Sequence, residues 1–114
     1  MNKKSPLQKL SLTEAVIAHL LRKYHPKQLY GLEMIKLSSD SDLQLKKGTI
    51  YVTLERMEKK GLVTSEMESE PREDVEEGKF YIPRRLYQLT SEGRQALEVL
   101  EKAVAQIPGF LKSS

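Results

Sequence analysis

Residues 48–63, GTIYVTLERMEKKGLV, and residues 84–93, RRLYQLTSEG, decide the fold. In the first stretch, apolar residues recur at the spacing of an amphipathic helix, and Gly61 suits the position just after a helix end. Residues 62–65 and 85–89 have the composition and alternation of short strands, and Thr90 suits the N-cap of another helix. These two stretches therefore predict a helix, two strands and a helix.

Working outward, the periodicity predicts helices over residues 12–23 and 30–37 and sets the third helix at 47–60, with a polar loop over residues 38–42. Ser11 or Thr13 is expected to cap the first helix. Its inward face is expected at Leu12, Ala15, Val16, His19 and Leu20. The second helix is expected to bury Leu32, Met34 and Ile35. The third helix is expected to bury Ile50, Leu54, Met57 and Gly61.

The predicted order is helix, helix, helix, strand, long loop, strand, helix. It indicates a mainly α fold with a small β-hairpin (α+β), a winged helix-turn-helix. We expect a basic N-terminal arm at residues 1–11, a DNA-binding domain at 12–89, a dimerisation helix at 90–107 and a tail at 108–114. Within the domain, the recognition helix is expected at about 47–60 and the wing at about 62–89.

The composition excludes several classes of protein. The 114 residues suit one domain, and the absence of Cys excludes disulfides, a cysteine nucleophile and Cys-based metal sites. His19 and His25 are the only histidines and have no acid cluster beside them, so we expect no metal, no cofactor and no enzyme activity. The chain shows neither a signal-peptide pattern nor a membrane-spanning run, which favours a cytoplasmic protein.

The charge is unevenly distributed along the chain. Residues 66–77, EMESEPREDVEE, carry seven acids and one base, so the other residues are net +9 although the whole chain is only +3. A chain that is basic outside one acidic loop favours a polyanionic partner. The tip of that loop, residues 69–78, is expected to be mobile and dispensable for binding to bulk DNA.

The polar face of the third helix suits a duplex. A major groove admits an α-helix whose N-terminal residues reach the base edges, and helix N-terminal amides attract phosphate. Lys46 and Lys47 oppose the helix dipole, a cost that a bound anion would offset. Val52 suits a thymine methyl, and Arg56 suits guanine or phosphate. Arg84 and Arg85 at the wing base suit phosphates or a minor groove. The expected DNA-binding residues include Lys46, Lys47, Thr49, Val52, Arg56, Arg84 and Arg85.

The motifs Gly48-Thr49-Ile50-Tyr51, 57–63 (MEKKGLV), 84–93 and 29–33 (LYGLE) together resemble the PadR family of bacterial transcriptional regulators, over roughly residues 12–105. The resemblance implies a dimeric repressor, in which Tyr51 contacts the DNA backbone and the last helix forms the dimer. Lys46 stands where the family often has a Ser or Thr cap, and Val52 where Pro usually follows the motif Tyr. The size and enlarged wing are similar to those of a cyanobacterial circadian-clock type, which implies a clock-gene promoter.

Two further expectations concern partners. Some PadR regulators bind small aromatic effectors near the dimer interface, although no residue of this chain indicates one separately. An alternative function is a dimeric winged-helix module that binds another protein through the acidic wing.

The last helix carries an apolar arc too wide for one small domain to cover, which favours a homodimer. The expected interface residues are Ala96, Leu97, Leu100, Ala103, Val104 and Ile107, with Val99 beside them.

Overall fold

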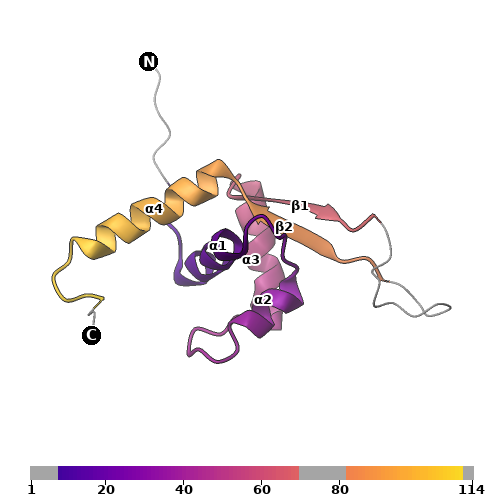
Figure 1. Ribbon diagram of the computed structural model, residues 1–114, viewed down its shortest axis with the longest axis horizontal. Helices are drawn as coiled ribbons and strands as arrows, with labels where there is room; N and C mark the ends of the chain where they lie inside the picture. The colour runs from indigo at the N-terminus through magenta and orange to yellow at the C-terminus, as the bar shows by residue number, and fades with distance from the viewer. Residues whose placement is uncertain (1–7, 70–81, 112–114) are drawn as a thin grey trace, which may run out of the picture.

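The computed structural model describes residues 8–69 and 82–111, in which three helices and a hairpin surround one core and a fourth helix extends from it (Figure 1). The helices are α1 (Leu12–Tyr24), α2 (Gly31–Leu37), α3 (Lys47–Lys59) and α4 (Ser91–Ala105). The strands are β1 (Val63–Met67) and β2 (Arg85–Leu89). This is the predicted α+β winged-helix order, with element ends within about two residues of expectation. The wing tip, apart from Ser69, and arm residues 1–7 lie outside the described residues.

Local sequence explains where the helices begin and end. Ser11 caps α1 by accepting a hydrogen bond from the Glu14 N–H, as predicted. At the end of α3, Gly61 adopts φ +78°, and the Leu62 N–H donates to the Met57 carbonyl at 2.9 Å. This Schellman arrangement, for which glycine is suited, turns the chain directly into β1. Thr90 caps α4 through the Gly93 N–H.

The hairpin is joined to the helices by a third piece of extended chain. β1 and β2 pair antiparallel, from Val63 opposite Leu89 to Met67 opposite Arg85. On the other edge of β2, Leu29 and Tyr87 exchange both backbone hydrogen bonds, at 2.8 and 3.1 Å. The segment between α1 and α2 therefore fixes the wing against the helical unit, a contact that the periodicity did not predict.

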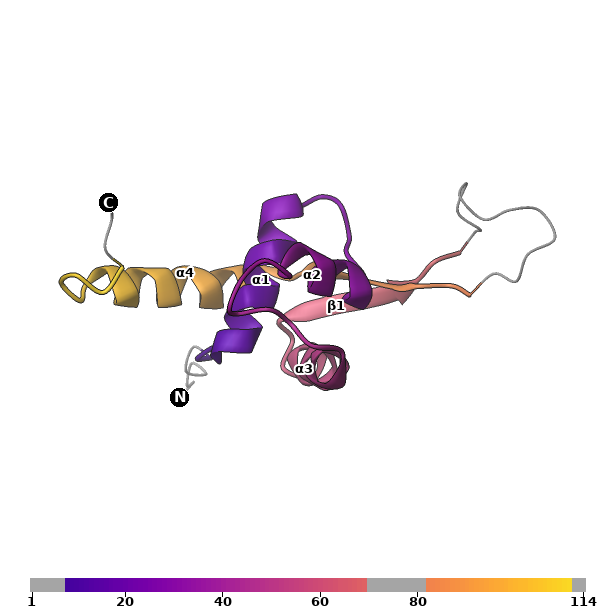
Figure 2. The ribbon, with the colours of Figure 1, turned by 90° about the horizontal axis from the view of Figure 1, so that it is seen from below.

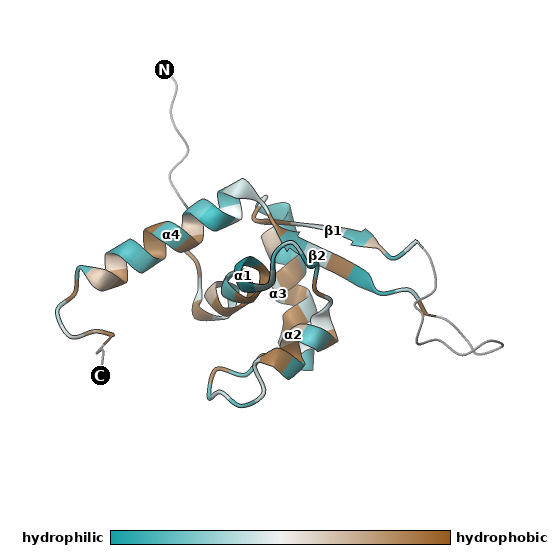
Figure 3. Cartoon of the chain, viewed as in Figure 1, coloured by the Kyte–Doolittle hydropathy of each residue, from teal (hydrophilic) through white to brown (hydrophobic). Residues whose placement is uncertain are grey.

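The core lies where α1, α2, α3 and the root of the hairpin meet. Figure 3 shows hydrophobic ribbon along α1 and α3 at this centre. The side chains with at most 2% exposure include Ile17, Leu29, Met34, Ile50, Leu54, Met57 and Leu62. From α4, the core receives only Ala96 and Leu97, near the start of the helix. The rest of α4 extends out of the domain on the side opposite the wing (Figures 1 and 2).

Three burial predictions were wrong. On α1, Leu20 is buried as predicted, but the inward face is centred on Ile17, Ala18 and Leu21, whereas Leu12 is 63% exposed and His19 is exposed. Leu32 of α2 is 50% exposed, and Gly61 is exposed beyond the end of α3. The error on α1 has a physical reason: apolar residues occur on most sides of this helix, so periodicity alone does not select the face that meets the core.

Candidate nucleic-acid interface

Helix α3 turns one face to the core and the opposite face to solvent. Ile50, Leu54 and Met57 are fully buried, whereas Val52 is 59% exposed and the Arg56 side chain is 50% exposed. Figure 2 views α3 nearly along its axis and shows it at the margin of the domain, with one side uncovered. The predicted binding residues Lys46, Lys47 and Thr49 are all exposed on or just before its first turn.

The N-terminus of α3 is electrostatically open to an anion. Lys46 occupies the N-cap position without a side-chain cap, and the first turn contains no acidic residue. The Thr49 hydroxyl donates to the Lys46 carbonyl at 3.3 Å, which leaves its oxygen able to accept. Two cations beside the positive end of the helix dipole cost about 0.3–1 kcal/mol each at the surface. A phosphate at this end would relieve that repulsion.

A groove of about 690 Å³ lies between the start of α2 and the base of the wing, and Tyr51 of α3 also lines it. It is lined by Tyr30, Gly31, Leu32, Glu33, Lys36, Tyr51, Ile82, Pro83, Arg84 and Arg85. The Arg84 guanidinium carbon lies 4.1 Å from the centre of the Tyr30 ring, and its backbone N–H donates to Glu68 Oε1 at 3.0 Å. The groove therefore brings together Tyr51, Arg84 and Arg85, three of the predicted DNA-binding residues.

Arg85 is held at the root of the wing by a short polar chain. Its Nη1 donates to the Ser65 hydroxyl at 3.0 Å, and that hydroxyl donates to the Glu58 carboxylate at 2.9 Å. Arg85 is exposed and lies near the Glu58 carboxylate, whereas Arg84 is stacked on Tyr30 and half-buried. Both arginines have fixed orientations beside the groove.

Comparison with known proteins identifies this arrangement. The model of the transcriptional regulator PadR-like family matches residues 17–99. The chain belongs to the PadR-like family. No curated protein matches the sequence.

Solved structures of two PadR regulators and of a circadian clock associated protein have the same fold. A PadR family transcription regulator from Clostridium difficile R20291 is 31% identical, with a TM-score of 0.66 over 84% of this chain and 90% of that one. A PadR-like transcriptional regulator from Bacillus cereus is 20% identical, with a TM-score of 0.64 over 90% and 94%. The circadian clock associated protein Pex from Anabaena is 23% identical, with a TM-score of 0.55 over 89% and 85%.

Membership of the PadR-like family makes the chain a transcription regulator that acts through DNA, and not an enzyme. Within residues 8–69 and 82–111, no helix has the length and apolar character needed to cross a membrane.

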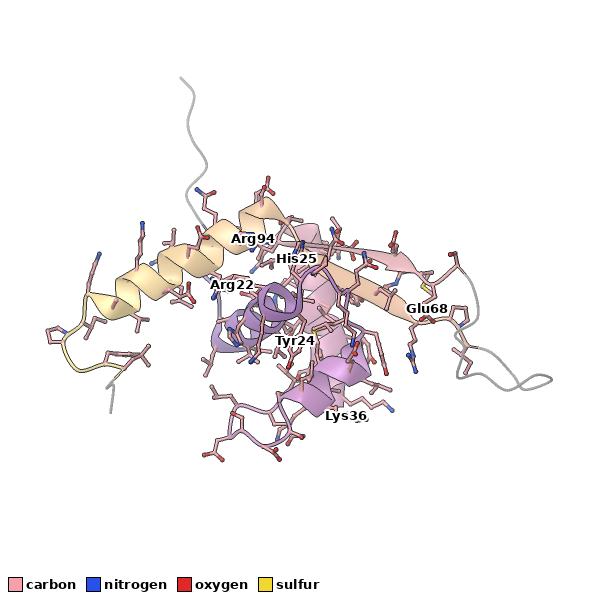
Figure 4. All side chains as sticks on the ribbon, viewed as in Figure 1. Arg22, Tyr24, His25, Lys36, Glu68 and Arg94 are labelled. Carbon is pink, nitrogen blue, oxygen red and sulfur yellow. The ribbon has the colours of Figure 1, made fainter. Side chains whose placement is uncertain are left out.

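Sequence patterns did not single out Lys36 and Tyr30 at this surface, or Glu14 buried beneath it. Lys36 lines the groove and projects from α2 away from the core (Figure 4). Tyr30 carries the stacked Arg84. Glu14 is 2% exposed and meets the far end of α3. The spacing of Ser11 and Glu14 is that of a capping box and signals the start of α1, but no local pattern signals contacts with residues more than 40 positions away.

Glu14 sets the environment of Arg56. Its Oε1 accepts the Ser11 N–H at 2.9 Å, while its Oε2 accepts Lys60 Nζ at 2.9 Å and lies 3.5 Å from Arg56 Nε. Burial raises the pKa of this carboxyl, but the hydrogen bonds from Ser11, Lys60 and Arg56 outweigh it and hold the pKa below its ordinary value. Arg56 is thus on a different side of α3 from Tyr51 and does not line the groove.

Proposed function

We propose that the chain is a homodimeric repressor that binds a specific operator in double-stranded DNA and blocks a promoter by occupying it. The observation that carries the proposal is the exposed first half of α3, with Lys46, Lys47, Thr49 and Val52, beside a cationic groove at the wing base. In a major groove, Thr49 and Val52 reach base edges, while Lys46 and Lys47 meet phosphates. Tyr51, Arg84 and Arg85 lie where the adjoining backbone passes.

The proposed dimer uses the outer part of α4. Ala96 and Leu97 are only 3% and 4% exposed because the core of the protomer already covers them, so these two expected interface residues are not available to a partner. Leu100 and Val104 are half-buried, and Ala103 and Ile107 are exposed. Soluble monomers seldom keep such a row of apolar side chains in water. A second copy would cover it.

A second groove lies on α1 and reaches Leu97 of α4. It measures about 470 Å³ and is lined by Ala15, Val16, His19, Leu20, Lys23, Tyr24, Leu37, Ser38, Ser41, Leu43 and Leu97. Of the residues of α1 that were predicted to face the core, Ala15, Val16, His19 and Leu20 line this groove, although Leu20 is also buried in the core. Two protomers related by a two-fold axis can cover both surfaces at once. Such a pair would present its α3 helices to half-sites about 34 Å apart.

The test is selection of bound sequences from a random DNA pool, followed by mobility shifts on the selected duplex and a shuffled one at low and high salt. The proposal expects a palindromic sequence with half-sites about one helical turn apart, and repression of a reporter whose promoter overlaps it. Failure to bind any duplex would leave the protein-interaction alternative. A clock-gene target stays a prediction, since the likeness to Pex concerns the fold alone.

A further inference from the structure

Glu14 is a buried charge at the junction of α1 and α3. An ionised carboxylate loses hydration on burial and is retained only where hydrogen bonds and opposite charges replace the water. Here the backbone of Ser11 satisfies one oxygen, and Lys60 and Arg56 share the other. The carboxylate therefore ties the start of α1 to the last turns of the recognition helix.

Glu14 contacts Arg56 through Nε and leaves the two terminal nitrogens of the guanidinium free. The contact is made by Nε, 3.5 Å from Glu14 Oε2, and the side chain is 50% exposed. Within the described part of the chain, neither terminal nitrogen of Arg56 makes a hydrogen bond or ion pair. The contact holds the stem of Arg56 and leaves both NH₂ groups to bind something else.

The position of Arg56 on α3 suits a phosphate. It lies nine residues after Lys47, which is about 13 Å along the helix axis. A major groove is about 12 Å wide, so with the start of α3 inside it, Arg56 stands near the phosphates at its edge. Arginine binds phosphate with two parallel hydrogen bonds, and a pre-oriented side chain loses less conformational entropy on binding.

We infer that Glu14 is a positioning residue for DNA binding, which holds Arg56 by its Nε so that the two terminal nitrogens meet a backbone phosphate. The inference rests on the proposed docking of α3 in DNA. It opposes simple electrostatics, in which removal of a carboxylate from a DNA-binding surface strengthens binding. The sign of the effect of Glu14→Gln thus separates positioning from charge.

The experiment compares Glu14→Gln with Glu55→Gln on the duplex selected by the wild-type protein. Glu55 lies on α3 with 70% of its side chain exposed, pairs with Lys59 at 3.9 Å and makes no ion pair with Arg56 within the described residues, so its replacement is a matched loss of one charge. We expect Glu55→Gln to bind DNA as tightly as wild type or tighter, and Glu14→Gln to bind about tenfold more weakly. Glu14→Gln should also lower the salt slope by about 0.9, the share of one phosphate contact.

A double-mutant cycle distinguishes positioning from general damage. Arg56→Ala should weaken binding in the wild-type background and add little in the Glu14→Gln background. Lys60→Met, which leaves Glu14 with Arg56, should keep most of the affinity. Full additivity, or an equal loss in Lys60→Met, would overturn the inference, as would Glu14→Gln binding like Glu55→Gln. If wild type binds no duplex, the proposed function itself fails.

Thermal melting shows whether Glu14→Gln is folded at the assay temperature. If it is not, Arg56→Lys decides, since lysine keeps the charge but has neither the Nε–H that faces Glu14 nor a fork of two nitrogens. Positioning predicts that Arg56→Lys binds DNA about as weakly as Arg56→Ala. Wild-type affinity for Arg56→Lys would show that charge alone acts at this position and would overturn the inference.

Discussion

Gly31, the first residue of α2, lies directly against the ring of Tyr51 on α3. A Cβ at Gly31 would stand 2.5 Å from Tyr51 Cε1 and 2.8 Å from the tyrosine hydroxyl oxygen. The ring therefore occupies the space that any other residue at position 31 would need. This contact fixes where the Tyr51 side chain enters the groove at the wing base, beside Arg84 and Arg85.

Gly31→Ala should displace the Tyr51 ring and weaken DNA binding. The clash involves the far end of a side chain, which can rotate away, so we expect the fold to persist and affinity to fall by roughly fivefold, as for loss of one hydrogen bond. Mobility shifts measure the effect. In the Tyr51→Ala background the same substitution should change affinity little; an undiminished loss there would show that the ring is not the cause.

Gly93→Ala should destabilise the fold. A Cβ at Gly93 would clash with the Leu62 carbonyl oxygen, which is part of the backbone and cannot move aside at little cost. We expect the free energy of unfolding to fall by about 1–3 kcal/mol. Gly48→Ala is the control in urea denaturation, because nothing lies within 4 Å of its Cβ and alanine favours a helix by about 0.5 kcal/mol. Equal stabilities for the two variants would contradict this packing.

The depressed pKa of Glu14 predicts acid sensitivity. A group whose pKa is lower in the folded than in the unfolded state contributes stability that is present above its ordinary value, here 4.5, and is lost as pH falls through the folded pKa. Arg22 likewise lowers the pKa of Glu101. Denaturation below pH 4.5 should show a shallower loss of stability in Glu14→Gln than in wild type. Identical pH profiles would mean that the carboxyl has the same pKa in both states.

The sequence predicted the elements better than their contacts. Capping and turn residues such as Ser11, Gly61 and Thr90 act locally, so their roles were readable and are confirmed. The inward face of α1 could not be predicted from the sequence, because which of Val16 and Ile17 faces the core depends on which other elements pack against α1. Helix periodicity placed Arg56 on the exposed face, but its contact with Glu14 spans 42 positions and follows only from the packing of α1 on α3.

Lys47→Ala and Thr49→Ala should affect DNA binding differently. Lys47 is expected to meet a phosphate, so its loss should weaken binding to all duplexes and lower the salt slope by about 0.9. Thr49 is expected to meet a base edge, so its loss should relax preference at one position by about 1–3 kcal/mol with the slope unchanged. Titrations of selected and shuffled duplexes over a range of salt measure both. If both variants had the same salt slope and the same sequence preference, α3 would not be the helix that contacts the base edges.

The dimer prediction concerns the part of α4 beyond the core. Arg22 of α1 lies between α1 and α4 (Figure 4), and its Nη1 donates to Glu101 Oε1 at 2.9 Å, which fixes the direction in which α4 leaves the domain. Leu100→Asp/Val104→Asp places two charges among the half-buried apolar residues of this helix without reaching Ala96 or Leu97 in the core. Two carboxylates desolvated against a second copy would be unpaired, so the dimer should dissociate while the protomer stays folded.

Gln95→Asp/Gln106→Asp adds the same charge at exposed polar positions and should stay dimeric. Sedimentation at micromolar concentration should give twice the 13.1 kDa chain mass for wild type and for this control, and one chain mass for the apolar-face variant. A wild-type mass near 13.1 kDa would refute the dimer, and a Leu100→Asp/Val104→Asp protein that stays dimeric would place its interface elsewhere than on α4.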